Sequence, residues 1–199
     1  YLKQLLIGFL LTATSLFAQD QSAFISADEL SSNSLKIFLF DVSKDSVFDE
    51  ERIEGAFHLT RKDFTEQTDP FHGAIGRKER IEDLLFSYGI QSNDRIVVYD
   101  HKGGSDAARF WWVLQYYGHK NAQVLEGGYM AWGDRKANFR TVENLAIEDK
   151  YLFNNEGKNI LADKQEVVAA MNDDAFVLVD TRMKEEFEGT MLKDPAKRA

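Results

Sequence analysis

The sequence alternates short runs of β-favouring apolar residues with stretches of helical periodicity. Two of these runs, Ile37–Phe40 and Arg95–Tyr99, are mostly apolar, and each is followed directly by an aspartate, Asp41 and Asp100. Strands buried on both faces show such continuous runs, because helices cover both faces of a parallel sheet. The alternation therefore predicts an α/β fold with a mostly parallel sheet, and it places a carboxylate at the C-terminal end of each of these two strands.

The other expected elements follow from periodicity and from residues that begin or end helices. Ser26 is placed to cap a short helix, because acidic residues follow it in the first turn. Gly89 and Gly118 each follow a helical stretch and are expected to end it. The remaining expected elements, in chain order, are a helix from Ala27, a solvated acidic loop at 45–51, a strand at 55–57, a helix over 75–88, a helix from Ser105 or Asp106 to Tyr117, a strand at 123–125 and a helix at 127–132.

The expected helix that ends at Tyr117 is apolar almost all the way round. A helix on the surface of a protein would show a polar face. We therefore expect one side of it to pack on its own sheet and the other to meet a second domain or subunit. For Trp111-Trp112 this interpretation favours packing between domains over a platform on which a ligand would stack.

The charge balance and the cysteine count exclude several classes of function. The chain has 199 residues, with 24 Lys and Arg against 33 Asp and Glu, and a net charge of −9. Such a chain has no basic field to attract nucleic acid or anionic lipid, so we expect no nucleic-acid partner. It contains no cysteine, which excludes disulfides, thiolate metal sites and thiol catalysis within these residues.

The first residues have the three regions of a secretory signal peptide. Lys3 precedes the apolar run Leu5–Ala13, and small residues lead to Ala18 before a polar stretch. Residues 1–18 are therefore predicted to be a signal peptide, cleaved after Ala18 or after Ser15, and the protein to be exported to the periplasm or secreted. A membrane anchor is the alternative, but the run is shorter than the roughly 20 residues of a spanning helix, so we expect no stable membrane insertion.

The opening pattern of the chain recurs after a polar segment. Ile25–Leu30 followed by Phe38–Asp41 is echoed by Ile160–Gln165 followed by Val177–Asp180. Self-similarity of this kind indicates an internal duplication of one domain. The expected order is a signal peptide at 1–18, a first domain at 24–137, a linker at 138–158 and the start of a second domain at 159–199.

Several motifs resemble those of the rhodanese family, in particular the tandem sulfurtransferases in which a linker joins two rhodanese-like domains. In the first copy they are Phe40-Asp41-Val42, Arg52-Ile-Glu-Gly-Ala56, Ile96-Val-Val-Tyr-Asp100, Ala107-Ala-Arg-Phe-Trp-Trp112, Gly118-His119, and Val124-Leu-Glu-Gly-Gly128 through Ala131-Trp132. The second copy adds Leu178-Val-Asp-Thr-Arg182 and Glu186-Phe-Glu-Gly189. The segment from Arg52 departs from the family's His-Ile-Pro-Gly-Ala, and the linker lacks the usual prolines. The resemblance implies a three-layer α/β domain, a parallel sheet flanked by helices, followed by the start of a second copy.

The resemblance also implies a sulfurtransferase whose nucleophile lies beyond residue 199. In the family a cysteine follows the Val-Val-Tyr strand, at the position that Asp100 occupies here. A carboxylate cannot take up a sulfane sulfur as a persulfide, whereas amides at a helix N-terminus stabilise a thiolate and its persulfide. Tandem members commonly pair such an Asp-bearing, non-catalytic first domain with a catalytic second one. We therefore expect no catalytic residue within this chain.

Arg182 is the expected substrate-binding residue. The resemblance implies this role, because the arginine of the family's Val-Asp-Ser/Thr-Arg motif faces the sulfur-donor site. A guanidinium suits an anionic donor such as thiosulfate or 3-mercaptopyruvate, since it is planar and always charged. An ordinary surface or interdomain ion pair is the alternative. The expected partners are a small anionic sulfur donor and a thiol or cyanide acceptor, with no cofactor and no metal, and the first domain is expected to pack against the second.

Two further patterns and one further function have to be considered. Gly103-Gly104 before a helix would suit either a phosphate cradle or a structural turn, and the flanking aspartates favour the turn. The four histidines lack paired ligand spacing, so a metal site is not favoured. If the second domain also lacks a thiol, the protein is instead a non-catalytic rhodanese-like binding or regulatory protein.

Overall fold

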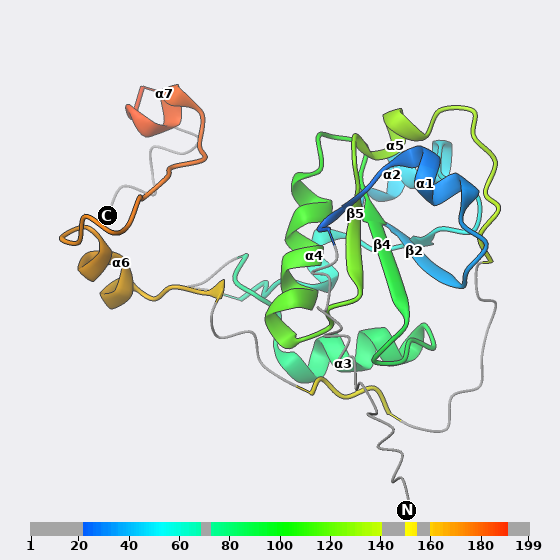
Figure 1. The fold of residues 1–199 in the computed structure, drawn as a ribbon, viewed down its shortest axis with the longest axis horizontal. Helices are drawn as coiled ribbons and strands as arrows, with labels where there is room; N and C mark the ends of the chain where they lie inside the picture. Colours follow the sequence, from blue (N-terminus) through cyan, green and yellow to red (C-terminus); the bar gives the residue numbers. More distant parts are fainter. Residues whose placement is uncertain (1–21, 69–72, 141–149, 155–159, 191–199) are drawn as a thin grey trace, which may run out of the picture. The chain divides into compact units, whose positions relative to one another are not determined.

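The computed structural model describes residues 22–68, 73–140, 150–154 and 160–190 (Figure 1). The chain divides into two compact units, residues 1–156 and 157–199, and each is described by itself. The predicted signal peptide, residues 1–18, lies outside the described residues. No helix among the described residues is long and apolar enough to cross a membrane.

The first unit is built on a parallel sheet of five strands, in the order β1-β5-β4-β2-β3. Helices lie against the sheet in Figure 1, which confirms the predicted α/β fold. The central pair β2 and β4 has the longest register, from Ile37 opposite Arg95 to Asp41 opposite Tyr99. The strands are β1 (Phe24–Ile25), β2 (Ile37–Asp41), β3 (Phe57–His58), β4 (Arg95–Tyr99) and β5 (Ala122–Leu125).

Side chains alternate between the two faces of the sheet and form two separate hydrophobic layers. Phe40 and Val98 face the layer that contains α3 and α4, whereas Leu39 and Val97 face the layer that contains α1 and α5. This alternation is the period of two that every strand imposes. The helices of this unit are α1 (Ala27–Ser32), α2 (Asp45–Glu50), the short 3₁₀ helix η1 (Arg61–Asp63), α3 (Lys78–Ser87), α4 (Ser105–Tyr117) and α5 (Gly128–Trp132).

Most of these helices begin and end where the sequence predicts, and two differ. Ser26 caps α1 as expected, since its Oγ accepts a hydrogen bond of 3.1 Å from the backbone N–H of Glu29. The acidic segment expected to be a loop forms α2, because Asp45 is favourable in a first turn and the half-buried Phe48 stacks on His58. Helix α3 begins later than predicted, at Lys78, because residue 75 forms an antiparallel bridge with Thr65.

Part of the predicted linker packs on the first unit. Tyr151 and Phe153 are 4% and 6% exposed and belong to the layer under α3 and α4. Phe139, also 6% exposed, contacts Trp132 in the opposite layer, with ring centroids 6.1 Å apart. These aromatic side chains therefore extend the hydrophobic core beyond α5.

The second unit contains the helices α6 (Lys164–Ala170) and α7 (Lys184–Phe187). Asp163 caps α6 by accepting hydrogen bonds from the backbone N–H groups of Gln165 and Glu166. Residues 177–180, which repeat the sequence pattern of β2, form no strand in the described structure: Val177 and Val179 are 86% and 76% exposed. The corresponding strand β2 is hydrogen-bonded on both sides, whereas no described residue pairs with 177–180.

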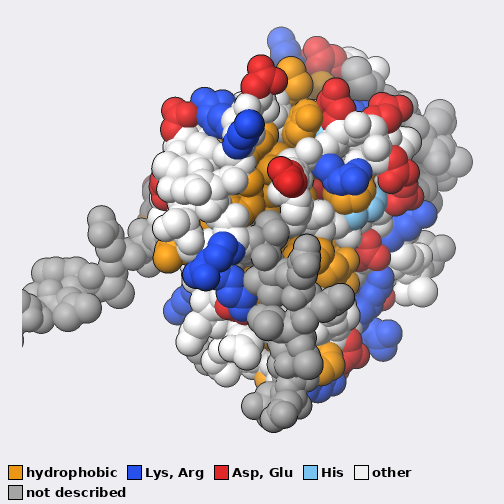
Figure 2. All heavy atoms as spheres, turned by 90° about the vertical axis from the view of Figure 1, so that its right-hand side faces the viewer, with side chains coloured by type: hydrophobic (Ala, Val, Ile, Leu, Met, Phe, Trp, Pro, Cys, Tyr) orange, Lys and Arg blue, Asp and Glu red, His pale blue; other side chains and the backbone are white. Residues whose placement is uncertain are grey.

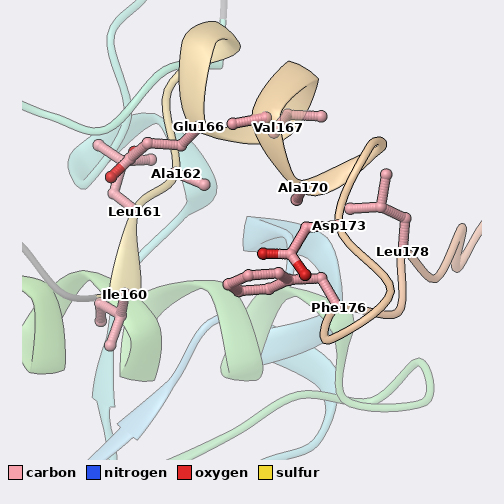
Figure 3. A pocket seen from close by; sticks show the side chains of 10 residues that line it. Ile160, Leu161, Ala162, Glu166, Val167, Ala170, Asp173, Phe176 and Leu178 are labelled. Carbon is pink, nitrogen blue, oxygen red and sulfur yellow. The ribbon is translucent and has the colours of Figure 1, made fainter.

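An apolar cavity of about 660 Å³ lies within the second unit (Figure 3). Side chains from α6 and from the segments on either side of it surround the cavity, among them Ile160, Leu161, Val167, Phe176 and Leu178. The cavity therefore lies on the face of α6 that carries Val167 and Ala170.

A substitution at the centre of the sheet tests this packing. Phe40 is fully buried and contacts Phe57, Tyr88 and Phe110. We expect Phe40→Ala to lower the free energy of unfolding by about 3–5 kcal/mol, because it removes apolar contact and leaves a cavity. Phe24→Ala is the matched control: it removes a ring that is 55% exposed, and its cost should be about 1 kcal/mol or less. Urea denaturation measures both, and equal costs would contradict the proposed core.

Candidate functional site

Asp100 lies directly after β4 and turns its carboxylate back into the loop that follows. The residue is only 4% exposed. Its Oδ1 accepts hydrogen bonds from the backbone N–H groups of Lys102 (2.8 Å) and Gly104 (2.9 Å). Its Oδ2 accepts from those of Asp106 and Ala107, both at 3.1 Å. Four backbone donors of the loop and of the first turn of α4 thus converge on one side chain.

The arrangement is an anion cradle that the protein fills with its own carboxylate. Gly103 and Gly104 have φ angles of 75° and 83°, a conformation that aims consecutive N–H groups to one side. The N-terminus of α4 adds the positive end of a helix dipole. The structural turn predicted for Gly103-Gly104 is present, and the amides of Lys102, Gly104, Asp106 and Ala107 are engaged by Asp100 rather than open to a phosphate.

The turn between β5 and α5 holds Asp100 from the other side. The backbone N–H of Tyr129 donates a hydrogen bond of 3.0 Å to the carbonyl oxygen of Asp100. A Cβ on Gly128 would lie 2.3 Å from that same oxygen, and Gly128 has a φ of +59°. Only glycine therefore fits at this position without moving the loop.

A second buried carboxylate, Asp41, lies at the neighbouring strand end. It is fully buried, and its Oδ1 accepts hydrogen bonds from the backbone N–H (2.9 Å) and the hydroxyl of Ser43. Its Oδ2 lies 3.0 Å from Nε2 of His101, whose ring stacks on Tyr129 with centroids 4.2 Å apart. Burial, with the charge of Asp41 nearby, raises the pKa of Tyr99 above its ordinary value. The Asp41–His101 pair does not follow from the sequence pattern, because it depends on β4 lying beside β2.

The other histidines of the first unit serve separate contacts. His58 places Nε2 3.0 Å from the carbonyl oxygen of Ser43, and His119 lies between Tyr151 and the backbone of Asp94. His72 lies outside the described residues. Among the residues that the structure describes, no group of three His, Asp or Glu side chains is arranged to hold a metal ion.

The paired tryptophans lie on α4 in two different environments. The Nε1–H of Trp111 donates a hydrogen bond of 2.9 Å to the carbonyl oxygen of Ala122, which ties α4 to β5. Trp112 stacks on Tyr116, and the guanidinium of Arg109 lies 4.9 Å from its ring centroid. Both tryptophans are partly buried against the core of their own unit.

Arg182 lies in the second unit and forms an ion pair with Asp180. Its Nη2 is 2.6 Å from Oδ2 of that carboxylate, and its Nε lies within 3.0 Å of both oxygens. The hydrogen bonds from Arg182 lower the pKa of Asp180 to about 2. The arginine side chain remains 57% exposed, so it can still reach a ligand.

A comparison with protein families decides the class of the first unit. The model of the Rhodanese-like domain matches residues 26–135, which includes the Asp100 loop and the whole sheet from β2 to β5. The chain belongs to the rhodanese family. The resemblance found in the sequence motifs is therefore confirmed.

Curated thiosulfate sulfurtransferases match most of the chain. A putative thiosulfate sulfurtransferase of Haloferax volcanii is 30% identical over 84% of this chain and 58% of its own length. The thiosulfate sulfurtransferase of Cricetulus griseus is 26% identical over 72% of this chain and 48% of its own length. The chain thus spans about half the length of the curated relatives that it matches.

Solved structures support the rhodanese fold. SseA from Escherichia coli, described as a 3-mercaptopyruvate sulfotransferase, superposes with a TM-score of 0.63 and 20% identity, covering 83% of this chain and 68% of its own. The Tum1 protein from Saccharomyces cerevisiae also gives 0.63, with 18% identity over 84% of this chain and 63% of its own. At these identities the similarity is one of fold.

Removing the carboxylate from the rhodanese loop tests the cradle. Asp100→Ala leaves four inward-facing amides without their acceptor, so we expect the free energy of unfolding to fall by about 2–4 kcal/mol. Asp100→Asn keeps one acceptor oxygen and should cost less. Asp49→Ala removes an exposed carboxylate and should change stability by about 0.5 kcal/mol or less. Urea denaturation would contradict the cradle if Asp100→Ala were as mild as the Asp49 control.

Proposed function

We propose that the protein is a sulfurtransferase of the tandem rhodanese type, which moves sulfane sulfur from thiosulfate or 3-mercaptopyruvate to a thiophilic acceptor. With thiosulfate, a cysteine thiolate attacks the outer sulfur, the S–S bond of thiosulfate breaks and sulfite leaves with the bonding electrons. The acceptor, a thiol or cyanide, then attacks the terminal sulfur of the resulting persulfide. This second displacement returns the thiolate, so the route is covalent nucleophilic catalysis.

The observation that carries the proposal is the anion cradle filled by Asp100. Four aligned amides at the start of α4 are the environment that a thiolate and an anionic persulfide require. In this unit a carboxylate holds that place, and the chain contains no cysteine. The first unit therefore has the backbone architecture of a sulfur site without its nucleophile. This is the arrangement proposed for the non-catalytic domain of a tandem rhodanese.

The proposed nucleophile is a cysteine beyond residue 199, in the second domain. Two observations support this position. The motif Leu178-Val-Asp-Thr-Arg182 repeats the pattern around Asp41, and the chain spans 48% to 60% of the length of its curated relatives. In this arrangement the first domain packs against the second, and α4 of the first domain supplies part of that contact.

Arg182 is the proposed donor-binding residue. Its guanidinium is held at one side by Asp180, and more than half of its surface remains open. The ion pair fixes the orientation of the planar group, which leaves N–H donors for an anionic donor. On the face drawn in Figure 2, acidic and basic side chains are interspersed and the described side chains form no continuous basic surface. The proposed ligand is accordingly a small anion bound at one place rather than a polyanion.

The predicted signal peptide at 1–18 supports a location outside the cytoplasm. We propose an exported protein that acts in the periplasm or as a secreted enzyme. Its proposed substrates are small and diffusible, and its proposed mechanism calls for no cofactor.

A sulfurtransfer assay on two lengths of chain tests the function. Residues 1–199 are expected to form no thiocyanate from thiosulfate and cyanide, because they lack a thiol, whereas the protein continued through its second domain should form it. Turnover by residues 1–199 alone would contradict the assignment of the nucleophile. A continuation without a cysteine after its second Val-Val strand would favour the non-catalytic binding or regulatory protein.

Arg182 can be tested in the continued protein. We expect Arg182→Ala to raise the KM for thiosulfate about tenfold or more, because it removes charge-assisted hydrogen bonds to the donor, with a smaller change in kcat. Arg182→Lys should recover part of the loss. Arg135→Ala, which breaks a comparable exposed ion pair with Asp28, is the matched control and should leave KM unchanged. An unchanged KM in Arg182→Ala would contradict the donor-binding role and would leave the ion pair with Asp180 as the function of this arginine.

A further inference from the structure

Residues 150–154, here called the strap, belong to the C-terminal end of the first unit and lie against the rest of it. The strap inserts two aromatic rings, Tyr151 and Phe153, whereas Leu152 between them is 58% exposed. The ring of Phe153 lies 5.2 Å from that of Tyr117 on α4, measured between centroids. The strap is thus held by alternate side chains.

Three polar contacts fix the strap. Lys150 forms an exposed ion pair of 3.0 Å with Asp83, and the backbone N–H of Phe153 donates to Oε1 of Glu82 at 2.9 Å. The third contact is buried: the hydroxyl of Tyr151 lies 2.8 Å from Nδ1 of His119. His119 is 1% exposed, so this last contact excludes water.

The surroundings of His119 determine which of its nitrogens carries a proton. Nε2 lies 3.0 Å from the backbone carbonyl oxygen of Asp94, which can only accept a hydrogen bond. Nε2 is therefore protonated, and in the neutral ring Nδ1 has a free lone pair that accepts the Tyr151 hydroxyl. The bound strap fits the neutral imidazole.

Protonation of the ring disrupts the contact with Tyr151. Nδ1 would then donate, so Tyr151 would have to accept and turn its own hydrogen away from its only described partner. The carboxylate of Asp94 already pairs with Lys36 at 3.0 Å and with the backbone of Gln91 at 2.9 Å. Burial lowers the pKa of His119, as expected for a cation that is costly to place there.

We propose that the Tyr151–His119 contact is an acid-sensitive latch, in which protonation of His119 releases the strap from the rest of the first unit. The released state exposes the imidazole to water and so binds the proton more tightly than the strapped state. The ordinary pKa of histidine is about 6.5, and above this pH the strap is fully held. Below it, linkage lowers the equilibrium constant for closing of the strap about tenfold for each pH unit. This equilibrium constant stops falling at the pH where His119 also becomes protonated in the strapped state.

Hydrogen exchange of single amides in residues 1–199 tests the latch. The protection factor of the Phe153 amide, followed by NMR between pH 7 and 5.5, should fall about tenfold per pH unit below about 6.5. The amide of Val97 in β4 serves as the internal reference and should keep its protection. A parallel fall at Val97 would mean global unfolding and would overturn the latch.

Variants separate His119 from the other charged groups nearby, which are Lys150 on the strap itself and Lys78, Glu79, Glu82, Asp83 and Asp94 around it. Glu82→Gln keeps an acceptor for the Phe153 amide without a titrating carboxylate, and it should preserve the pH dependence. His119→Gln should abolish it. Tyr151→Phe keeps the ring and removes the hydroxyl, so protection at pH 7 should fall about three- to tenfold.

The opposite results would overturn the proposal. They are a pH dependence that persists in His119→Gln or disappears in Glu82→Gln, or a Tyr151→Phe strap as protected as the wild type. If His119→Gln does not fold, the pH titration of the His119 ring in the wild-type protein is the deciding measurement. Titration of that ring near pH 6.5 while the Phe153 amide stays protected would show that the strapped state accepts the proton, which the latch forbids.

Discussion

The parallel pairing of β2 with β4 at the centre of the sheet determines where the two buried carboxylates of the first unit lie. Because the two strands run in the same direction, Asp41 and Asp100 both emerge at the carboxyl edge. Their side chains then face different partners: Asp100 turns into the amides of its own loop, and Asp41 meets His101 from the neighbouring strand. The edge where an α/β fold usually places its ligands is here stabilised by two carboxylates of the chain itself.

The Asp100 loop is a backbone shape that stabilises an anion, and in this unit the anion is a carboxylate of the chain itself. Convergent amides at the start of a buried helix stabilise any anion placed among them, whether a persulfide or a carboxylate. A carboxylate that fills the cradle satisfies these donors, and it also keeps an external anion out. Gly128, at the start of α5, lies with its backbone against the carbonyl of Asp100 and holds the loop from that side. The first unit can therefore retain the family fold without retaining a reactive group.

Local sequence was sufficient where a feature depends on neighbours in the chain, and insufficient where it depends on contacts across the fold. The strand ends at Asp41 and Asp100 and the cap at Ser26 followed from apolar runs and residue type. The orientation of four amides toward Asp100 could not follow from pattern, because it depends on positive φ angles at Gly103 and Gly104. The Asp41–His101 pair required the strand order. For the strap, the signal available was an apolar triplet, Tyr151-Leu-Phe153, within an otherwise polar segment.

The two copies of the opening pattern also show that contacts across the fold decide whether an apolar run forms a strand. Phe38–Asp41 and Val177–Asp180 have similar sequences, yet only the first forms a strand among the described residues. The first is hydrogen-bonded to β3 and β4 and covered by helices on both faces, so each apolar side chain is removed from water. Exposed valines such as Val177 and Val179 gain nothing from an extended conformation alone, since β-propensity mainly reflects packing on a half-buried surface. The same apolar run is thus a core strand in one context and an exposed surface in the other, and its partners make the difference.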